Sequence, residues 1–438
     1  MSEPIHISIQ LRKGWLALTI LVAAGLICSS SSSAFGSDKD KKKNEPPPPP
    51  QKSIYDVIDK SKVVWPQPPN IARVKYLDYF AGEKLPDFSA QTAKPKSSWM
   101  DRLAGTTQEK GDNPLKNHFF MGEPHGLAID SKGRLYVADG KVGAIFIIDP
   151  ETKETQMIKN GKDAGFALIN GLAIDDSDRL FVSDSQAHRI LVFDKNHKGE
   201  AAITQGLVTP AGMAIDNENR FLYVADIGQD QVLVFDADNL TPLRRIGTPK
   251  TGHQSTALGD FSKPTSVAVD QDGNVYVTDM LNYRVEVFDA DGQFIRAFGK
   301  HGDGPGYFAM PKGIAVDCDG HVWVTDSMQN RVHLFTQEGE LLMWMGNKQG
   351  ALPGTFSGLQ YIMIDKQNRV FTSEVYPGRV QMFRYVTQDE AQKEFARREA
   401  EKASRTPGTP ATQPQKALPP PFPSPEKQND KGDTPKAN

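Results

Sequence analysis

Apolar and polar residues alternate with a period of two in short runs along the middle of the chain, and turn residues separate the runs. The stretch from Pro264 to Gly299 shows this pattern most clearly, with four runs at Ser266–Asp270, Val275–Asp279, Arg284–Phe288 and Gln293–Phe298. Strands of this length joined by Asp- and Gly-containing turns predict an antiparallel meander. One such sheet cannot bury both of its faces, so it requires similar sheets beside it.

The same pattern occurs six times along the chain. In each copy an acid ends the first apolar run, and these acids are Asp130, Asp175, Asp216, Asp270, Asp317 and Asp365. The intervals between them are 45, 41, 54, 47 and 48 residues. Four short strands repeated at this period are typical of propeller blades. We therefore predict an all-β fold, a six-bladed β-propeller of four-stranded antiparallel blades.

The last copy supplies only three strands and ends near Tyr385. Near the N-terminus, Arg73–Ala81 has the length and alternation of a further strand. We predict that it pairs with Arg379–Tyr385 as the outermost strand of the last blade. A ring closed in this way by both chain ends leaves no open blade.

The repeated unit also carries a family resemblance. Its pattern is P-x-G-I/L-A-V/I-D-x-x-G-x-V/L-Y/F/W-V-x/T-D-x-x-x-N/H-R-V/I-x-V-F-D, which resembles the NHL repeat. The resemblance is clearest in Pro264–Phe298 and Pro311–Met345 and extends from Arg73 to Tyr385. It implies the six-bladed fold and leaves the activity open, because this fold carries many unrelated functions.

The first 36 residues differ from the repeats. They contain a short basic segment, the apolar run Trp15–Cys28 and a small-residue site that ends at Gly36. This arrangement is typical of a cleaved secretory signal peptide. An uncleaved N-terminal membrane anchor and a lipidated Cys28 are the alternatives. We expect an exported protein in the periplasm or outside the cell of a bacterium, with membrane tethering if the segment stays uncleaved.

Composition divides the rest of the chain. Residues 37–71 are charged and then proline-rich, which predicts an extended tether. The propeller is expected at 72–386, with residues 83–123 as an insertion of functional or disordered character. Residues 387–405 are rich in Ala, Glu, Lys and Arg and predict a short helix. The proline-rich, polar tail 406–438 is expected to be disordered.

Charge and cysteine content exclude several classes of protein. The net charge of −3 argues against a nucleic-acid-binding domain, which would be strongly basic. Once the signal is removed, Cys318 is the only cysteine, so the mature chain forms no internal disulfide. We expect a monomer without a membrane span after signal cleavage. Its partner is expected to be an unknown envelope protein or small ligand, and not nucleic acid.

An acid follows the second strand of every copy: Asp139, Asp184, Asp226, Asp279, Asp326 and Glu374. Because these acids recur in all copies, we expect them to accept backbone N–H bonds and hold turns. Arg189, Arg284, Arg331 and Arg379 stand five residues later and are expected to pair with them. Phe261, Phe308 and Phe356 precede first strands and are expected to wedge between blades, and the apolar segment Asn117–Met121 has the matching place before the first copy.

Function is expected where the copies differ. By register, the positions around the central channel are His125, Asn170, Ala211, Thr265, Lys312 and Gln360. Tyr283 and Tyr361 stand in neighbouring loop and strand positions. A rigid ring of variable side chains is suited to recognition. We predict a ligand-binding site at the channel mouth, formed by His125, Asn170, Lys312, Gln360, Tyr283 and Tyr361.

A metal-dependent propeller enzyme is the alternative. Pro124–Ala128 resembles the corresponding segment of peptide-amidating lyases, which implies a ligand role for His125. Zinc needs about three protein ligands, whereas the ring offers one histidine, and His118, His253 and His301 lie only in nearby loops. Lactonase-type propellers hold calcium with carboxylates and amides, and this ring lacks a carboxylate. We predict a non-catalytic binding scaffold without a cofactor, with a zinc or calcium lyase or lactonase as the alternative.

Overall fold

The computed structural model describes residues 58–82, 120–159, 164–248, 255–346 and 349–405. The predicted signal peptide, most of the predicted tether, residues 83–119 of the insertion and the C-terminal tail lie outside the described residues. His118 and His253 lie outside them as well. Among the described residues, no helix is both long enough and apolar enough to span a membrane.

Six antiparallel sheets form the blades, numbered here in chain order. Blade one consists of β3 (Pro124–Ile129), β4 (Leu135–Asp139), β5 (Ala144–Ile148) and β6 (Thr155–Lys159). Blade two consists of β7 (Ile169–Ile174), β8 (Leu180–Asp184), β9 (Arg189–Phe193) and β10 (Gly199–Ile203). Blade three consists of β11 (Pro210–Asp216), β12 (Phe221–Asp226), β13 (Gln231–Asp236) and β14 (Pro242–Ile246).

The second half of the ring repeats this organisation. Blade four consists of β15 (Pro264–Val269), β16 (Val275–Asp279), β17 (Arg284–Phe288) and β18 (Phe294–Phe298), with the short 3-10 helix η3 (Met280–Asn282) between β16 and β17. Blade five consists of β19 (Pro311–Val316), β20 (Val322–Asp326), β21 (Arg331–Phe335) and β22 (Leu341–Met345). Blade six consists of β23 (Leu359–Ile364), β24 (Arg369–Glu374), β25 (Arg379–Tyr385) and strands from the N-terminal segment.

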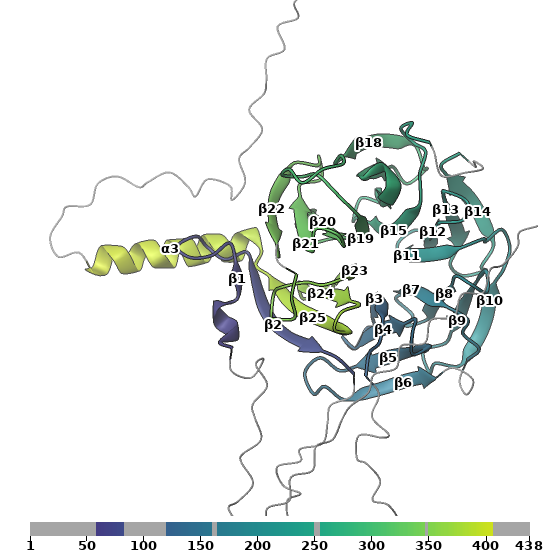
Figure 1. Ribbon diagram of the computed structural model, residues 1–438, viewed down its shortest axis with the longest axis horizontal. Helices are drawn as coiled ribbons and strands as arrows, with labels where there is room; N and C mark the ends of the chain where they lie inside the picture. Colours follow the sequence, from purple (N-terminus) through teal and green to yellow (C-terminus); the bar gives the residue numbers. More distant parts are fainter. Residues whose placement is uncertain (1–57, 83–119, 160–163, 249–254, 347–348, 406–438) are drawn as a thin grey trace, which may run out of the picture. The chain divides into compact units, whose positions relative to one another are not determined.

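The first strand of each blade contacts the first strand of the next, and β23 contacts β3 to complete the circle. These six strands surround the centre of the ring in Figure 1. We call the face at which the first strands begin the upper face and the opposite face the lower face. Because the strands alternate in direction, the loops entering first strands and the loops joining second to third strands both lie on the upper face. The predicted six-bladed fold is confirmed.

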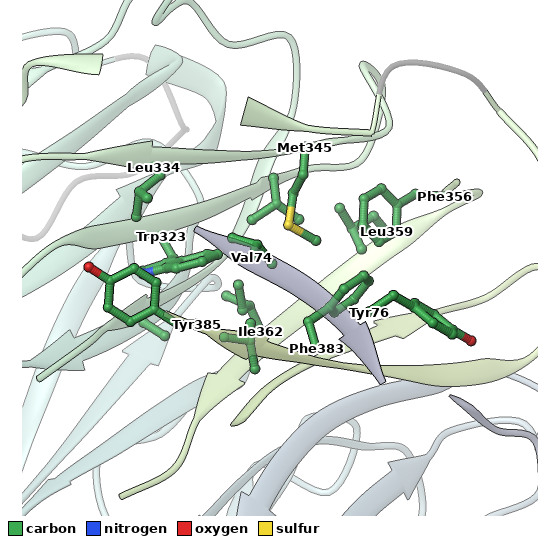
Figure 2. Packing of buried hydrophobic residues seen from close by; sticks show 13 residues of the cluster. Val74, Tyr76, Trp323, Leu334, Met345, Phe356, Leu359, Ile362, Phe383 and Tyr385 are labelled. Carbon is green, nitrogen blue, oxygen red and sulfur yellow. The ribbon is translucent and has the colours of Figure 1, made fainter. Parts of the chain in front are cut away.

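The N-terminal strand closes the ring as predicted. β2 (Val74–Phe80) pairs with β25 in antiparallel register, from Val74 opposite Tyr385 to Phe80 opposite Val380. Tyr76 and Phe383 lie side by side in Figure 2, and their rings meet edge-to-face with centroids 5.5 Å apart. A short strand that the sequence pattern did not reveal, β1 (Val64–Trp65), adds to the outside of β2 after the 3-10 helix η1 (Lys60–Lys62). Blade six therefore has five strands.

Apolar side chains between adjacent blades form the core. The valines of the second strands are fully buried in these layers: Val137, Val182, Val224, Val277 and Val324. Phe261, Phe308 and Phe356 are also buried between blades, as expected. In the segment before β3, Met121 takes the buried position, while the side chain of Phe120 is 49% exposed.

The helix α3 (Gln388–Arg405) follows blade six. Thr387 and Glu390 form a capping box at its start, since the Thr387 hydroxyl accepts from the Glu390 N–H and the Glu390 carboxylate accepts from the Thr387 N–H. Ala391 is buried, and Gln388 accepts a hydrogen bond of 2.9 Å from Arg73. The first turn of α3 is thus joined to the strand that closes the ring.

Candidate functional site

The structure brings the second residues of the six first strands together at the centre of the upper face. They line a small cavity of about 80 Å³, whose lining residues are His125, Asn170, Ala211, Ile227, Thr265, Lys312, Gln360 and Tyr361. The register argument thus placed His125, Asn170, Lys312, Gln360 and Tyr361 at one site. Apart from Ala211 and Tyr361, the ring residues are partly buried, so their polar groups face the cavity at limited solvent exposure.

Hydroxyl groups from the second strands hold the ring in place. Ser373 donates to the carbonyl of His125 at 2.6 Å, and Thr278 donates to the carbonyl of Lys312 at 3.0 Å. In the same way, Thr325 donates a hydrogen bond to the carbonyl of Gln360, and Ser183 donates one to the carbonyl of Ala211. Each of these four hydroxyls crosses from one blade to the next.

The same hydroxyls also accept hydrogen bonds within their own blades, where the pairing of the first and second strands is irregular. All six first strands have a register shift after their first residue. At this bulge the Ser183 hydroxyl accepts from the Gly171 N–H, and the Thr325 hydroxyl accepts from the Gly313 N–H, both at 2.7 Å. A Ser or Thr directly before the acid that follows the second strand supplies this hydroxyl. This sequence signal was not used in the sequence analysis. Ala138 and Ala225 occupy that position in blades one and three.

The glycine of the P-x-G motif allows adjacent first strands to approach each other. A Cβ at Gly171 would lie 2.2 Å from the carbonyl oxygen of Ala211, and a Cβ at Gly126 would lie 2.3 Å from that of Asn170. Two blades lack this glycine and carry Ser266 and Tyr361 instead. The tyrosine is the larger departure, because its side chain has to find space in the channel.

Tyr361 crosses the centre of the ring. Its hydroxyl accepts a hydrogen bond of 3.2 Å from the backbone N–H of Met213 in β11, which belongs to the blade opposite β23. The side chain is 8% exposed, and burial raises the pKa of its hydroxyl. Tyr361 therefore forms the floor of the cavity, which opens toward the upper face. Sequence reasoning named Tyr361 as a contact residue but did not predict this role.

Among the described residues that line the cavity, there is one ammonium group and no carboxylate. Burial lowers the pKa of Lys312, and the neighbouring Lys263 adds to this shift. Burial also lowers the pKa of His125, followed by the charge of Lys312, while Glu123 and Asp139 oppose the shift. The imidazole is thus biased toward its neutral form by the same lysine that makes the cavity cationic.

Tyr283 and His301 lie away from this cavity. Tyr283 follows η3 with a left-handed backbone, and its ring lies 4.3 Å from that of His301. His301 is exposed, and neither residue is among those that line the cavity. The structure therefore separates Tyr283 from the other five residues predicted for the site.

The donors around the cavity do not fit a zinc or calcium site. Within the part of the chain that the structure describes, no three His, Cys, Asp or Glu side chains gather as metal ligands. The ring offers one imidazole, two amides and a hydroxyl, whereas protein zinc sites use about three nitrogen, sulfur or carboxylate ligands and calcium prefers carboxylates. No catalytic step through a metal is derived for this site.

The repeat acids hold the incoming loops on the upper face. Asp139 accepts from the N–H groups of Gly122 and Glu123 at 2.6 and 3.1 Å, and Asp326 accepts from Ala309 and Met310 at 2.6 and 3.1 Å. The acids at the equivalent positions also accept from backbone N–H groups: Asp184, Asp226, Asp279 and Glu374. All six are completely buried. Their geometry is structural, since their acceptor oxygens face backbone donors.

Three of the four expected acid–arginine pairs are present. Arg284 contacts Asp279 at 2.9 Å, Arg379 contacts Glu374 at 3.0 Å and Arg189 contacts Asp184 at 3.2 Å. Arg331 differs from the expectation, because its guanidinium donates to Gln329 and lies 5.7 Å from the centre of the Trp344 ring. The large exposed indole beside Arg331 provides an alternative partner for the guanidinium.

Each blade places at least one exposed apolar side chain in its upper-face loops, between 37% and 66% exposed. We call one of them from each blade the apolar ring: Val142, Leu168, Val208, Leu281, Met328 and Tyr376. Phe120, Leu258 and Leu352 are further exposed apolar residues in loops that enter first strands. The turns joining first to second strands on the lower face consist of polar residues and glycine, apart from Cys318. Single exposed apolar residues are ordinary on protein surfaces. Exposed apolar residues also occur on fourth strands, at Leu243, Phe294, Ile295 and Trp344. The upper face is distinguished because all six blades contribute exposed apolar residues to it around a polar cavity.

Comparison with known families agrees with the repeat pattern. The model of the NHL repeat family matches residues 121–148 and 308–335. The model of the SMP-30/Gluconolactonase/LRE-like region matches residues 197–299. Together with six four-stranded blades around one axis, these matches define the class of protein. The chain is a six-bladed β-propeller in which two segments match the NHL repeat.

A curated relative matches part of this propeller. It is a probable peptidyl-alpha-hydroxyglycine alpha-amidating lyase of Caenorhabditis elegans, 34% identical over 87 residues. The matched stretch covers 20% of this chain and 24% of the lyase, so the chain spans about a quarter of that relative's length.

Solved structures match this chain at low identity. Virginiamycin B lyase from Staphylococcus aureus is 13% identical, with a TM-score of 0.46, and the match covers 60% of this chain and 96% of that one. A gluconolactonase from Xanthomonas campestris is 17% identical, with a TM-score of 0.47, and covers 60% of this chain and 86% of its own. Similarity at this level carries no argument about activity.

Proposed function

We propose that this propeller is a non-catalytic binding module, exported to a bacterial cell envelope, that holds a protein partner on its upper face. The observation that carries the proposal is the apolar ring around a cavity with one ammonium and no carboxylate. Exposed apolar surface rimmed by polar groups marks interaction sites. The partner that fits presents an apolar surface with an acidic group opposite the cavity.

The rigidity of the upper face supports this role. The buried acids hold the entering loops in place by accepting hydrogen bonds from backbone N–H groups. Hydrogen bonds from hydroxyls of one blade to carbonyls of the next fix the ring residues. A surface that is already ordered loses little conformational entropy on binding. The variable residues of the six blades are thereby presented in one fixed arrangement.

Site-specific photo-crosslinking tests the proposal. A benzophenone amino acid at Leu281, on the upper face, is expected to give a discrete adduct in envelope extract, whereas the same group at Gln271, in a lower-face turn, is expected to give none. Met328→Asp should abolish the Leu281 adduct without unfolding the protein, because Met328 is 64% exposed. Lys366→Asp in a lower-face turn is the control. Equal adducts from both faces, or an adduct unchanged by Met328→Asp, would overturn the proposal.

A metal-dependent lyase or lactonase is the second candidate. The matches to the amidating lyase and to the gluconolactonase-like region favour it. The donor set of the cavity weighs against it, as described above. Metal analysis of the purified protein separates the two candidates. Stoichiometric zinc or calcium that is lost in His125→Ala would establish the second candidate and overturn the first.

A further inference from the structure

We propose that the central cavity is a carboxylate-binding site in which Lys312 provides the counter-charge and Asn170 a hydrogen bond. The inference rests on the proposed binding function and specifies the chemistry of what enters the cavity. The carboxylate belongs either to a small free acid or to the C-terminus of a peptide chain.

The first observation is an ammonium group without a counter-ion. Lys312 is partly buried at the cavity wall, and among the described residues its side chain forms no ion pair or hydrogen bond. Its neighbours in the cavity are amides, a hydroxyl, an imidazole and apolar groups. Partial burial of a charge is unfavourable unless the charge is paired. An anion in the cavity would supply the missing partner.

The second observation concerns the neutral groups of the cavity. Within the described chain the Asn170 carboxamide has no hydrogen-bond partner, so its N–H₂ group is available to an acceptor. The Thr265 hydroxyl, by contrast, donates to the Lys312 carbonyl at 2.8 Å and thereby fixes the backbone of that lysine. Asn170 in blade two and Lys312 in blade five thus present donors from two sides of one cavity.

Few charged groups act on the titratable residues of the cavity. Lys263 and Lys312 both act on this region, and Glu123 and Asp139 act on His125. Asp139 is buried and accepts four backbone N–H groups, which balance its charge locally. The repeat acids of the other blades are buried and bonded to backbone N–H groups in the same way. Among the described residues, the ammonium groups of Lys263 and Lys312 therefore act on this region, and Glu123 is the opposing carboxylate whose charge is not taken up by backbone donors.

The size of the cavity selects a small head group. It measures about 80 Å³, whereas a cavity that holds one water molecule needs roughly 10–15 Å³. Tyr361 closes the floor through its bond to Met213, so a ligand enters from the upper face and its remainder lies outside the cavity. A carboxylate at the end of a chain meets this requirement, because only its terminal group has to enter.

Calorimetric titration and thermal shift with acetate, N-acetylalanine and N-acetylalaninamide test the inference, with chloride at equal ionic strength as the reference. Acetate and N-acetylalanine are expected to bind and to raise the melting temperature, and the uncharged amide is expected to do neither. Tighter binding of N-acetylalanine than of acetate would assign a chain terminus, and equal binding a free acid. Lys312→Met should weaken binding by about tenfold or more, because a hydrogen bond to a charged group is lost.

Matched variants keep the result interpretable. Lys366→Met removes an exposed lysine from a lower-face turn and should bind like the parent, and Asn170→Ala should bind less well. Ligand-free Lys312→Met should be at least as stable as the parent, because it lacks an unpaired, partly buried charge. Equal binding of N-acetylalanine and its amide, or undiminished binding by Lys312→Met, would overturn the inference. The Leu281 adduct would then still stand by itself as the test of the binding function.

Discussion

The hydroxyl of Tyr361 lies 3.2 Å from the backbone nitrogen of Met213, on the opposite side of the ring. This single contact joins blade six to blade three and closes the channel below the ring residues. A tyrosine can occupy the axis only because it replaces the glycine that most other blades carry at this position. The cavity thus owes its floor to one departure from the repeat.

Tyr361→Phe should test the importance of this contact. Loss of the hydroxyl leaves the buried Met213 N–H without its acceptor, which is expected to cost about 1–3 kcal/mol of unfolding free energy. Tyr376→Phe is the matched control, because Tyr376 is 66% exposed and should lose nothing. Denaturant unfolding of both variants measures the difference. Equal stabilities would mean that the contact between the opposite blades is not significant.

Gly171→Ala should destabilise the ring at the junction of blades two and three. The added Cβ would lie 2.2 Å from the carbonyl oxygen of Ala211, so the first strands would have to separate. Overpacking of this kind costs about 1–3 kcal/mol. Gly165→Ala is the control, since a Cβ there meets nothing within 4 Å. Thermal unfolding of the two variants should show a lower melting temperature only for Gly171→Ala.

Glu286 should make stability fall as the pH rises from 4.5 to 7. Its carboxyl is buried beside Asp279, and both share Arg284; burial raises the pKa of Glu286 to about 7. The native state therefore binds more protons than the unfolded chain in this interval, so the stabilisation present below pH 4.5 is lost as the pH passes 7. The free energy of unfolding that is lost over the whole interval is roughly 3 kcal/mol.

Glu286→Gln isolates this contribution. The amide oxygen can still accept from Arg284 and Gly259 but carries no charge. Compared with the parent, the variant should gain stability progressively between pH 5 and pH 8 in denaturant unfolding. A difference that is independent of pH would contradict the shifted pKa.

His333 should contribute in the opposite direction. It is buried between Phe308 and Phe335, and both of its ring nitrogens lack a partner among the described residues. Burial lowers its pKa to about 4, so stability should be lost as the pH falls from 6.5 through 4. His333→Leu should stabilise the protein by about 1–3 kcal/mol, because two unpaired polar atoms leave the core. Melting curves at pH 5 and 7 should show the larger gain at pH 5.

Removal of residues 1–82 should destabilise the whole propeller, whereas removal of residues 1–57 should not. The longer truncation deletes β2 and its buried Val74, Tyr76 and Phe80. At about 1.5–3 kcal/mol for each buried side chain, the loss is at least about 5 kcal/mol. Calorimetric melting of the two truncations measures the difference. Coincident transitions would show that ring closure by β2 is energetically unimportant.

The sequence by itself determined the number of blades, their strands, the closure of the ring and the residues around its centre. These follow from short-range patterns, because alternation, turn residues and repeat length act within a few tens of residues. The acids after the second strands were recognisable in the same way, since a feature shared by every blade serves the fold.

Only the tertiary structure decided what the central residues can do. Three features depend on which residues far apart in sequence come together. They are the path of Tyr361 to Met213, the separation of Tyr283 from the cavity, and the ammonium of Lys312, which has no partner within the described part of the chain. The apolar ring likewise appears as one surface only when six loops meet on one face. Such relationships are set by the closure of the ring, which brings distant residues together, and no local pattern encodes the distances between them.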